Sequence, residues 1–230
     1  MEFGTKKLLA TYLGLLFSLF GMCQMAIVTD PDGWTNVRQE PDVNAKVLRE
    51  VNVGEFFFWY DFQLLEADSN WIPIYFSRNK FTLGQHPFDL LKGYIHKSRI
   101  LPLDSMEEFR GSGFTFRYVL APFDSLSGNK IIDKLNGLPH SINGRHMWGT
   151  DGFWPQNEVR TIRLTIQGVP VPIHEVFYSD IFDCTNTYKV YHYNNLFVVH
   201  QWNSDGAGAY ELLWVFDKNG VRQRLVGVII

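Results

Sequence analysis

The stretch DGWTNVRQEP, residues 32–41, is the first part of the chain with the pattern of folded protein. Its Asp-Gly pair is typical of a turn. After it, Trp34, Asn36 and Arg38 alternate with two β-branched residues, which places the two sets on opposite faces of a strand. Pro41 ends the run. The stretch therefore predicts a turn that leads into a β-strand.

Short apolar runs continue on both sides of this stretch, separated by the turn clusters DPDG, QEPDVN, NVGE and EADSN. Closely spaced short strands with turn residues between them are typical of a small barrel or sandwich. No helical period interrupts them. The runs cover residues 26–28, 34–37, 47–53, 56–60, 71–76, 93–95 and 100.

These runs resemble a bacterial SH3-like (SH3b) domain over about residues 26–103. The resemblance rests on GWTNVRQEPDVNAKVLREVNVGE, then WIPIYF, then GYIHKSRI, in that order. The matching positions are Asn36, Val37, Arg38, Pro41, Val47, Gly54, Trp71, Gly93, Tyr94, Ile95 and His96. The resemblance implies a small β-barrel that attaches an exported protein to cell-wall peptidoglycan or to peptides.

One departure from the family pattern is SRNKFTLGQHPFDLL, residues 77–91, an insertion between two expected strands. It lies where a binding surface could be remodelled. Ligands of such barrels lie beside exposed aromatic side chains, which supply much of the binding energy. The predicted ligand-binding residues are Trp34, Tyr94, Phe81, His86 and Phe88. Trp59, inside FFFWYDF, and Trp71 are predicted to be buried instead.

The segment LPLDSMEEFRGSGFTF, from residue 101, predicts a boundary. Ser105 and Glu108 have capping-box spacing, which favours one helical turn, and Gly111-Ser112-Gly113 then breaks it. We therefore expect an SH3-like barrel over 24–103, a linker over 104–113 and a second β-rich domain over 114–230. A short helix is predicted over 127–136, with Gly137 as its stop.

The second half predicts a sandwich-like β domain with minor helix. TIRLTIQG places Ile162, Leu164 and Ile166 on one face of a half-buried strand. VPVPIH carries two prolines and favours an edge strand or extended arm. Hairpins are predicted around Asn194-Asn195 and around the two-residue turn Asn219-Gly220. We recognise no family from the residues of this half.

The N-terminus has the pattern of a secretory signal peptide over residues 1–23. Two lysines precede an apolar run from Leu8 to Phe20, and small residues follow. Cleavage after Cys23 is predicted, and lipidation of Cys23 is the alternative. The protein is therefore expected to be exported, periplasmic or secreted. If Cys23 leaves with the signal, Cys184 stands alone and forms no internal disulfide.

Composition limits the partners. Hydrophobic residues make up 46% and charged residues 20% of the 230 residues, an ordinary globular balance. Aromatic residues reach 16%, which favours strands. The net charge of −3 predicts no strong attraction to nucleic acid or anionic lipid.

Catalytic and metal patterns are weak. Asp183-Cys184-Thr185, with His192 and His200 downstream, resembles the nucleophile context of exported cell-wall cysteine peptidases. A nucleophilic cysteine is favoured at a helix N-terminus, whereas strand is predicted after Cys184. The histidines lack metal-ligand spacing, and the Asp-Gly loops are turn formers. No cofactor, metal site or catalytic residue is therefore predicted.

These observations together predict a non-enzymatic cell-envelope binding protein. Its expected partner is peptidoglycan or an envelope protein, and it has no integral membrane span once the signal is removed. The C-terminal domain is expected to recognise a protein or glycan. Two alternatives stay open: a cell-wall cysteine hydrolase that uses Cys184, and a periplasmic inhibitor or immunity protein.

Overall fold

The computed structural model describes residues 23–60, 70–84, 86, 89–126, 130–150, 152–203 and 206–228. The chain is mostly β, as the sequence predicts, with single turns of 3-10 helix between strands. The predicted signal segment lies outside the described residues except for Cys23, which begins the first strand. Within the described part, no helix has the length and apolar character needed to cross a membrane.

Residues 23–103, the first half, form one seven-stranded sheet in the order β3-β2-β6-β5-β4-β1-β7. Its elements are β1 (Cys23–Val28), β2 (Trp34–Arg38), β3 (Val47–Asn52), β4 (Phe56–Tyr60), β5 (Trp71–Phe76), β6 (Leu91–His96), η3 (Lys97–Arg99) and β7 (Ile100–Pro102). Neighbouring strands are antiparallel, and the sheet curls around a core that includes Val37, Trp59 and Ile74.

The first half does not form the closed barrel that the sequence predicts. The ladders between described strands leave β3 and β7 as the two edges of the sheet. β7 has only three residues, all paired with β1, and the ladder of β2 with β6 is limited to Arg38 and Tyr94. The sheet is open because its edge strands, β3 and β7, do not pair with each other.

Residues 114–228, the second half, form three antiparallel sheets, with strand orders β13-β12-β8, β11-β10-β9 and β14-β15-β16-β17. The elements after β7 are η4 (Leu103–Ser105), β8 (Phe114–Pro122), β9 (Ile132–Leu135), β10 (Leu138–Ile142), β11 (Arg145–His146), β12 (Asn157–Ile166), β13 (Val169–Pro170), η5 (Glu175–Phe177), β14 (Lys189–Tyr193), β15 (Leu196–Asn203), η6 (Gly206–Gly208), β16 (Tyr210–Asp217) and β17 (Gly220–Val228).

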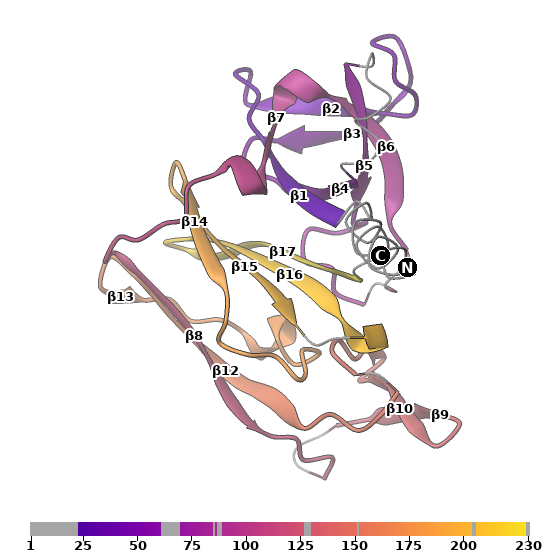
Figure 1. The fold of residues 1–230 in the computed structure, drawn as a ribbon, viewed down its shortest axis with the longest axis vertical. Coiled ribbons are helices and arrows are strands. Elements are labelled where there is room, and N and C mark those ends of the chain that lie inside the picture. Colours follow the sequence, from indigo (N-terminus) through magenta and orange to yellow (C-terminus); the bar gives the residue numbers. More distant parts are fainter. Residues whose placement is uncertain are drawn as a thin grey trace, which may run out of the picture.

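The β14–β17 sheet is the middle layer of the molecule (Figure 1). One of its faces packs against β8 and β12 through side chains such as Trp214 and Phe216. Its other face packs against β1 and β4 of the first half, where Leu213 and Val215 meet Phe58 and its neighbours. Because both faces are covered, all eight residues of β16 are buried.

Several local predictions for the second half are confirmed. Ile162, Leu164 and Ile166 are buried along β12, with more exposed residues between them. β13 is a two-residue edge strand, as its prolines predict. Hairpins join β14 to β15 and β16 to β17. The second turn lies one residue earlier than predicted, because Asp217 pairs with Gly220 across Lys218 and Asn219.

The predicted helix over 127–136 is wrong. Residues 132–135 form β9, which pairs with β10 so that Leu135 lies opposite Leu138. Asn136 and Gly137, with φ of 54° and 83°, make the two-residue turn between them. Asn-Gly is the preferred pair for such a turn, so this glycine belongs to a hairpin and does not stop a helix. The turn predicted at Ser105–Glu108 lies earlier, as η4, and Met106 is already extended.

Polar contacts also join the two halves. The Gln223 side chain accepts a hydrogen bond from the Phe56 amide and donates one to the Phe56 carbonyl, both at 2.8 Å. The backbone of a paired strand would make the same two hydrogen bonds. At Gly227 an added Cβ would lie 2.7 Å from the Phe58 ring, so this glycine permits close approach. The halves therefore share one packed interface.

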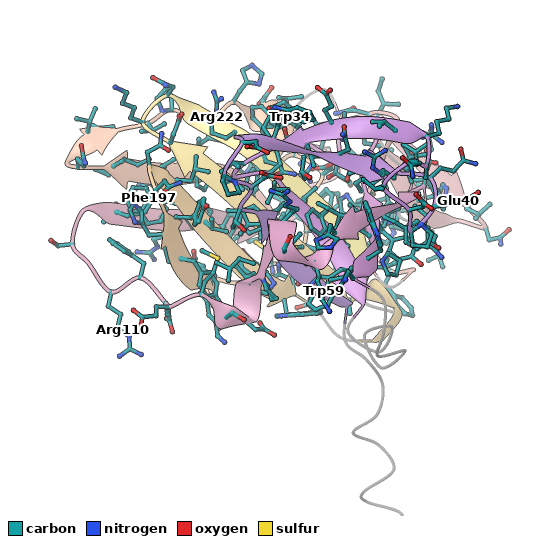
Figure 2. All side chains as sticks on the ribbon, turned by 90° about the horizontal axis from the view of Figure 1, so that it is seen from above. Trp34, Glu40, Trp59, Arg110, Phe197 and Arg222 are labelled. Atoms are coloured by element: carbon teal, nitrogen blue, oxygen red, sulfur yellow. The ribbon has the colours of Figure 1, made fainter. Side chains whose placement is uncertain are left out.

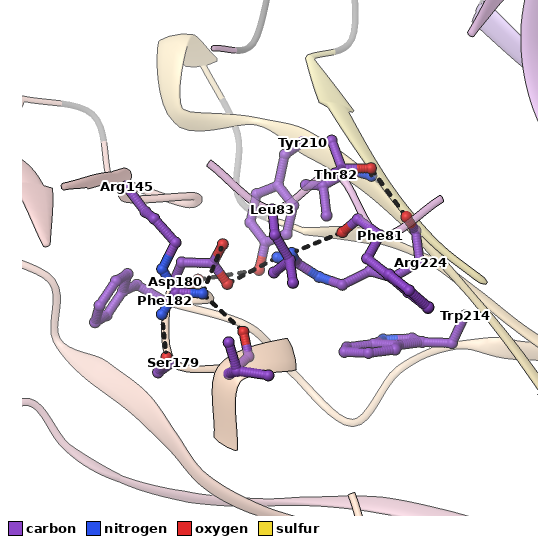
Figure 3. A network of polar contacts seen from close by, with 12 residues as sticks. Phe81, Thr82, Leu83, Arg145, Ser179, Asp180, Phe182, Tyr210, Trp214 and Arg224 are labelled. Atoms are coloured by element: carbon purple, nitrogen blue, oxygen red, sulfur yellow. Dashed lines mark hydrogen bonds and ion pairs between the residues drawn. The ribbon is translucent and has the colours of Figure 1, made fainter. Parts of the chain in front are cut away.

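A buried cluster around Arg224 adds further polar contacts between the two halves (Figure 3). Arg224 is fully buried, and its guanidinium donates to Asp180 at 2.8 Å and to the Phe81 carbonyl at 3.2 Å. The Thr82 hydroxyl donates to the Arg224 carbonyl at 2.9 Å. The beginning of the 77–91 insertion is thus bound to the second half.

Candidate functional site

A groove of about 470 Å³ lies on the outer face of the first half. It is bordered by β2, by the facing ends of β5 and β6, and by η3. Its lining includes Trp34, Trp71, His96, Asp30, Arg99 and Arg38.

Aromatic rings form two walls of the groove. The alternation along β2 directs Val37 into the core and leaves Trp34, 43% exposed, on the outer face. Trp71 and His96 are opposite each other in the β5–β6 ladder, and their rings meet edge to face at 5.5 Å. A groove with one exposed and two half-buried rings on different strands can bind a ligand by stacking and apolar contact.

Charged side chains hold the loops around the rings. Arg99 donates to the buried carboxylate of Asp30 at 2.8 Å, and the same oxygen accepts from the Asp32 amide at 2.9 Å. Arg38 donates to the Ala45 carbonyl at 2.7 Å and so holds the adjacent loop. The His96 ring contacts the Ser98 hydroxyl at 2.7 Å. These contacts fix the groove before any ligand arrives.

The structure brings only part of the predicted site together. Trp34 lines the groove, whereas Trp59 is buried; Figure 2 shows them apart from each other in the first half. Tyr94 does not line the groove, although it lies on the same face of β6 as His96, opposite Arg38, with the Lys92 ammonium 5.6 Å from its ring. Phe88 lies outside the described residues.

The inserted segment lies elsewhere. The Phe81 ring packs against Phe177 at 5.1 Å, and the Phe81 carbonyl accepts from Arg224, so Phe81 is part of the interface between the halves. His86 is exposed, and its carbonyl accepts from the Asp89 amide at 2.9 Å. Phe81 and His86, both predicted as ligand-binding residues, therefore do not line the groove.

Trp71 and His96 are groove residues that the sequence reasoning missed. Trp71 alternates with Ile72 and Ile74, which are 3% and 0% exposed, so the tryptophan faces outward. The strict alternation of WIPIYF places Trp71 on the strand face opposite Ile72 and Ile74, because neighbouring residues of a strand point to opposite sides of the sheet. The prediction that Trp71 is buried is corrected to half-buried.

Cys184 is not positioned as a nucleophile. It is 1% exposed within the core of the second half. Burial, and then the neighbouring Asp183 carboxylate, raises the pKa of the thiol to about 12. A nucleophilic cysteine needs the opposite shift. His200 is paired with Glu211, and His192 packs against Phe109 and Phe197.

The described ranges hold no group of three or more His, Cys, Asp or Glu side chains placed to bind a metal ion. His146 is half-buried next to Trp148, and this partial burial lowers its pKa to about 4.

Comparisons with known proteins found no matching family model, no matching curated protein and no matching solved structure. The groove is therefore interpreted from its own residues.

Proposed function

We propose that the protein is an exported cell-envelope binding protein whose first half is an SH3-like (SH3b) module. Its groove binds peptidoglycan or a wall-linked peptide. The observation that carries the proposal is the exposed Trp34 ring in one groove with Trp71 and His96. Sugar rings and peptide backbones present apolar faces and hydrogen-bonding groups that such a surface accepts.

The proposal includes export and the absence of thiol chemistry. The N-terminal sequence pattern supports export, and the mature chain is expected to begin near Gln24. The raised pKa of the buried Cys184 thiol supports binding over cysteine hydrolysis. Terminal sequencing of the protein recovered from the cell envelope tests the first part. A mature protein that keeps Met1 in the cytosol contradicts it.

The binding test is co-sedimentation with purified peptidoglycan, measured together with the melting temperature. Trp34→Ala should weaken binding by about 1–3 kcal/mol, which is roughly 5- to 150-fold in Kd. Trp71→Ala should weaken it similarly. Trp154→Ala is the matched control, because Trp154 is 40% exposed but belongs to the second half.

Unchanged sedimentation of both groove variants would place the binding face elsewhere. If the wild type does not sediment with the wall but retains one envelope protein, the inhibitor or immunity function takes precedence. Release of wall peptides that Cys184→Ser abolishes would establish the hydrolase instead.

A further inference from the structure

A second and larger cleft, of about 690 Å³, lies between the two halves. Met25, Leu103 and Met106 border it from the first half and the linker. β14, β15 and β16 form its other side. None of the groove residues line this cleft, so it is a separate site.

A buried pair of ionisable side chains belongs to this cleft. Glu211 is 1% exposed, and its Oε1 is 2.6 Å from Nε2 of His200. Its other oxygen, Oε2, is buried and has no hydrogen-bond partner within the described part of the chain. Burial raises the pKa of Glu211, and the contact with His200 offsets part of this rise. A buried carboxylate oxygen without a donor is costly, so it is suited to accept one from a ligand.

The rest of the lining is acidic and aromatic. Asp104 and Glu108, two exposed carboxylates, line the cleft together with Glu211, against the single lysine Lys189. Trp202 lies directly opposite Glu211 in the β15–β16 ladder and is 39% exposed. Tyr188 and Tyr191 add two further rings. Carboxylates beside aromatic faces attract cations by charge and by cation–π contact.

From these contacts we propose that the cleft binds a primary ammonium group on an aliphatic chain, as found in lysine side chains and diamines. The ammonium group donates to Glu211 and to the Asp104 side of the cleft. Its alkyl chain lies along Met25, Leu103 and Met106. The Trp202 ring covers the cation from the exposed side. This proposal does not depend on wall binding by the Trp34 groove.

The probes are cadaverine and Nα-acetyl-lysine methylamide, titrated into the full mature chain by calorimetry. Their uncharged partners are diacetylcadaverine and the Nε-acetylated lysine derivative. Both charged probes should bind, and acetylation of the amines should weaken binding at least about tenfold, because it removes the cation. Tighter binding of the lysine derivative identifies a peptide side chain as the source, and tighter binding of cadaverine identifies a free diamine.

Glu211→Gln keeps the shape of the side chain and should raise the Kd of the charged probes at least about tenfold. Asp104→Asn, at an exposed position, should raise it severalfold without affecting folding, and it keeps the test valid if Glu211→Gln does not fold. Glu107→Gln is the control, because Glu107 is an exposed acid of the same linker that does not line the cleft.

Absence of binding for both charged probes overturns the proposal. So does equal binding of charged and acetylated probes, or a Kd that neither Glu211→Gln nor Asp104→Asn changes. Trp34→Ala should leave amine binding unchanged, so failure of the wall-binding function and failure of this site give different results.

Discussion

Two parts of the same sheet face in the first half have opposite surroundings. Around β1 and β4 the outer face carries Met25, Ile27, Phe56 and Phe58, and the second half covers it. Around β2 and β6 the outer face carries Trp34 and His96 and borders the open groove. In both parts, side chains alternate along the strands between the core and the outer face. The covered part contributes stability, and the open part is available for a ligand.

The largest expected effect is at the buried contact between the halves, where Arg224→Met should destabilise the protein by about 3–5 kcal/mol. The substitution leaves the buried carboxylate of Asp180 without its 2.8 Å partner. Denaturant unfolding measures the loss. Arg222→Met is the control, because Arg222 is exposed and 3.6 Å from Asp217, so the change should be below about 1 kcal/mol. Equal losses of stability in the two arginine variants would show that burial does not make the Arg224 contact more important than the Arg222 contact.

Leu213→Ala tests the apolar contact between the halves and should cost about 2–5 kcal/mol. Leu213 is fully buried in the cluster that contains Met25 and Phe58. Leu48→Ala, at a position 41% exposed on β3, should stay within about 0.5 kcal/mol. Fluorescence and circular dichroism should report one shared transition for the whole chain. Two separate transitions would mean that the halves unfold independently, as the predicted domain boundary at 104–113 requires.

Trp71→Ala should cost only about 1–2 kcal/mol, because a half-buried aromatic loses part of its apolar contact. Ile74 is fully buried on the opposite face of the same strand, so Ile74→Ala should cost about 2–5 kcal/mol. Melting temperatures of the two variants give the comparison. A larger loss at Trp71 than at Ile74 would contradict the assignment of Trp71 to the groove.

The smallest effect is expected at Cys184, whose thiol should resist alkylation in the folded protein. With a pKa of about 12 in place of 9, its thiolate fraction at pH 8 is lower by roughly a thousandfold. Iodoacetamide should therefore label Cys184 slowly at pH 8 and rapidly after addition of denaturant. Mass spectrometry measures the labelled fraction. Rapid labelling of the native protein would show that the thiol is accessible and ionised.

The sequence by itself determined the strands and most of their turns. The β12 pattern and the hairpin at Asn194-Asn195 depend on residues close in the chain, so local rules located them. The exposure of Trp34 followed from its position after a turn, and the burial of Trp59 from its apolar neighbours. The Asn136-Gly137 turn is an equally local signal, and it outweighs the weak helical spacing before it.

Only the tertiary structure decided which strand faces are covered. Alternation places Trp71 and Ile72 on opposite faces but does not say which face meets a second layer. Likewise, nothing local in the 77–91 insertion predicts that Lys80, Phe81 and Thr82 meet Arg224, more than a hundred residues later in the chain. The physical reason is that turn chemistry and side-chain period act between neighbours. Burial arises when distant layers exclude water from a shared face.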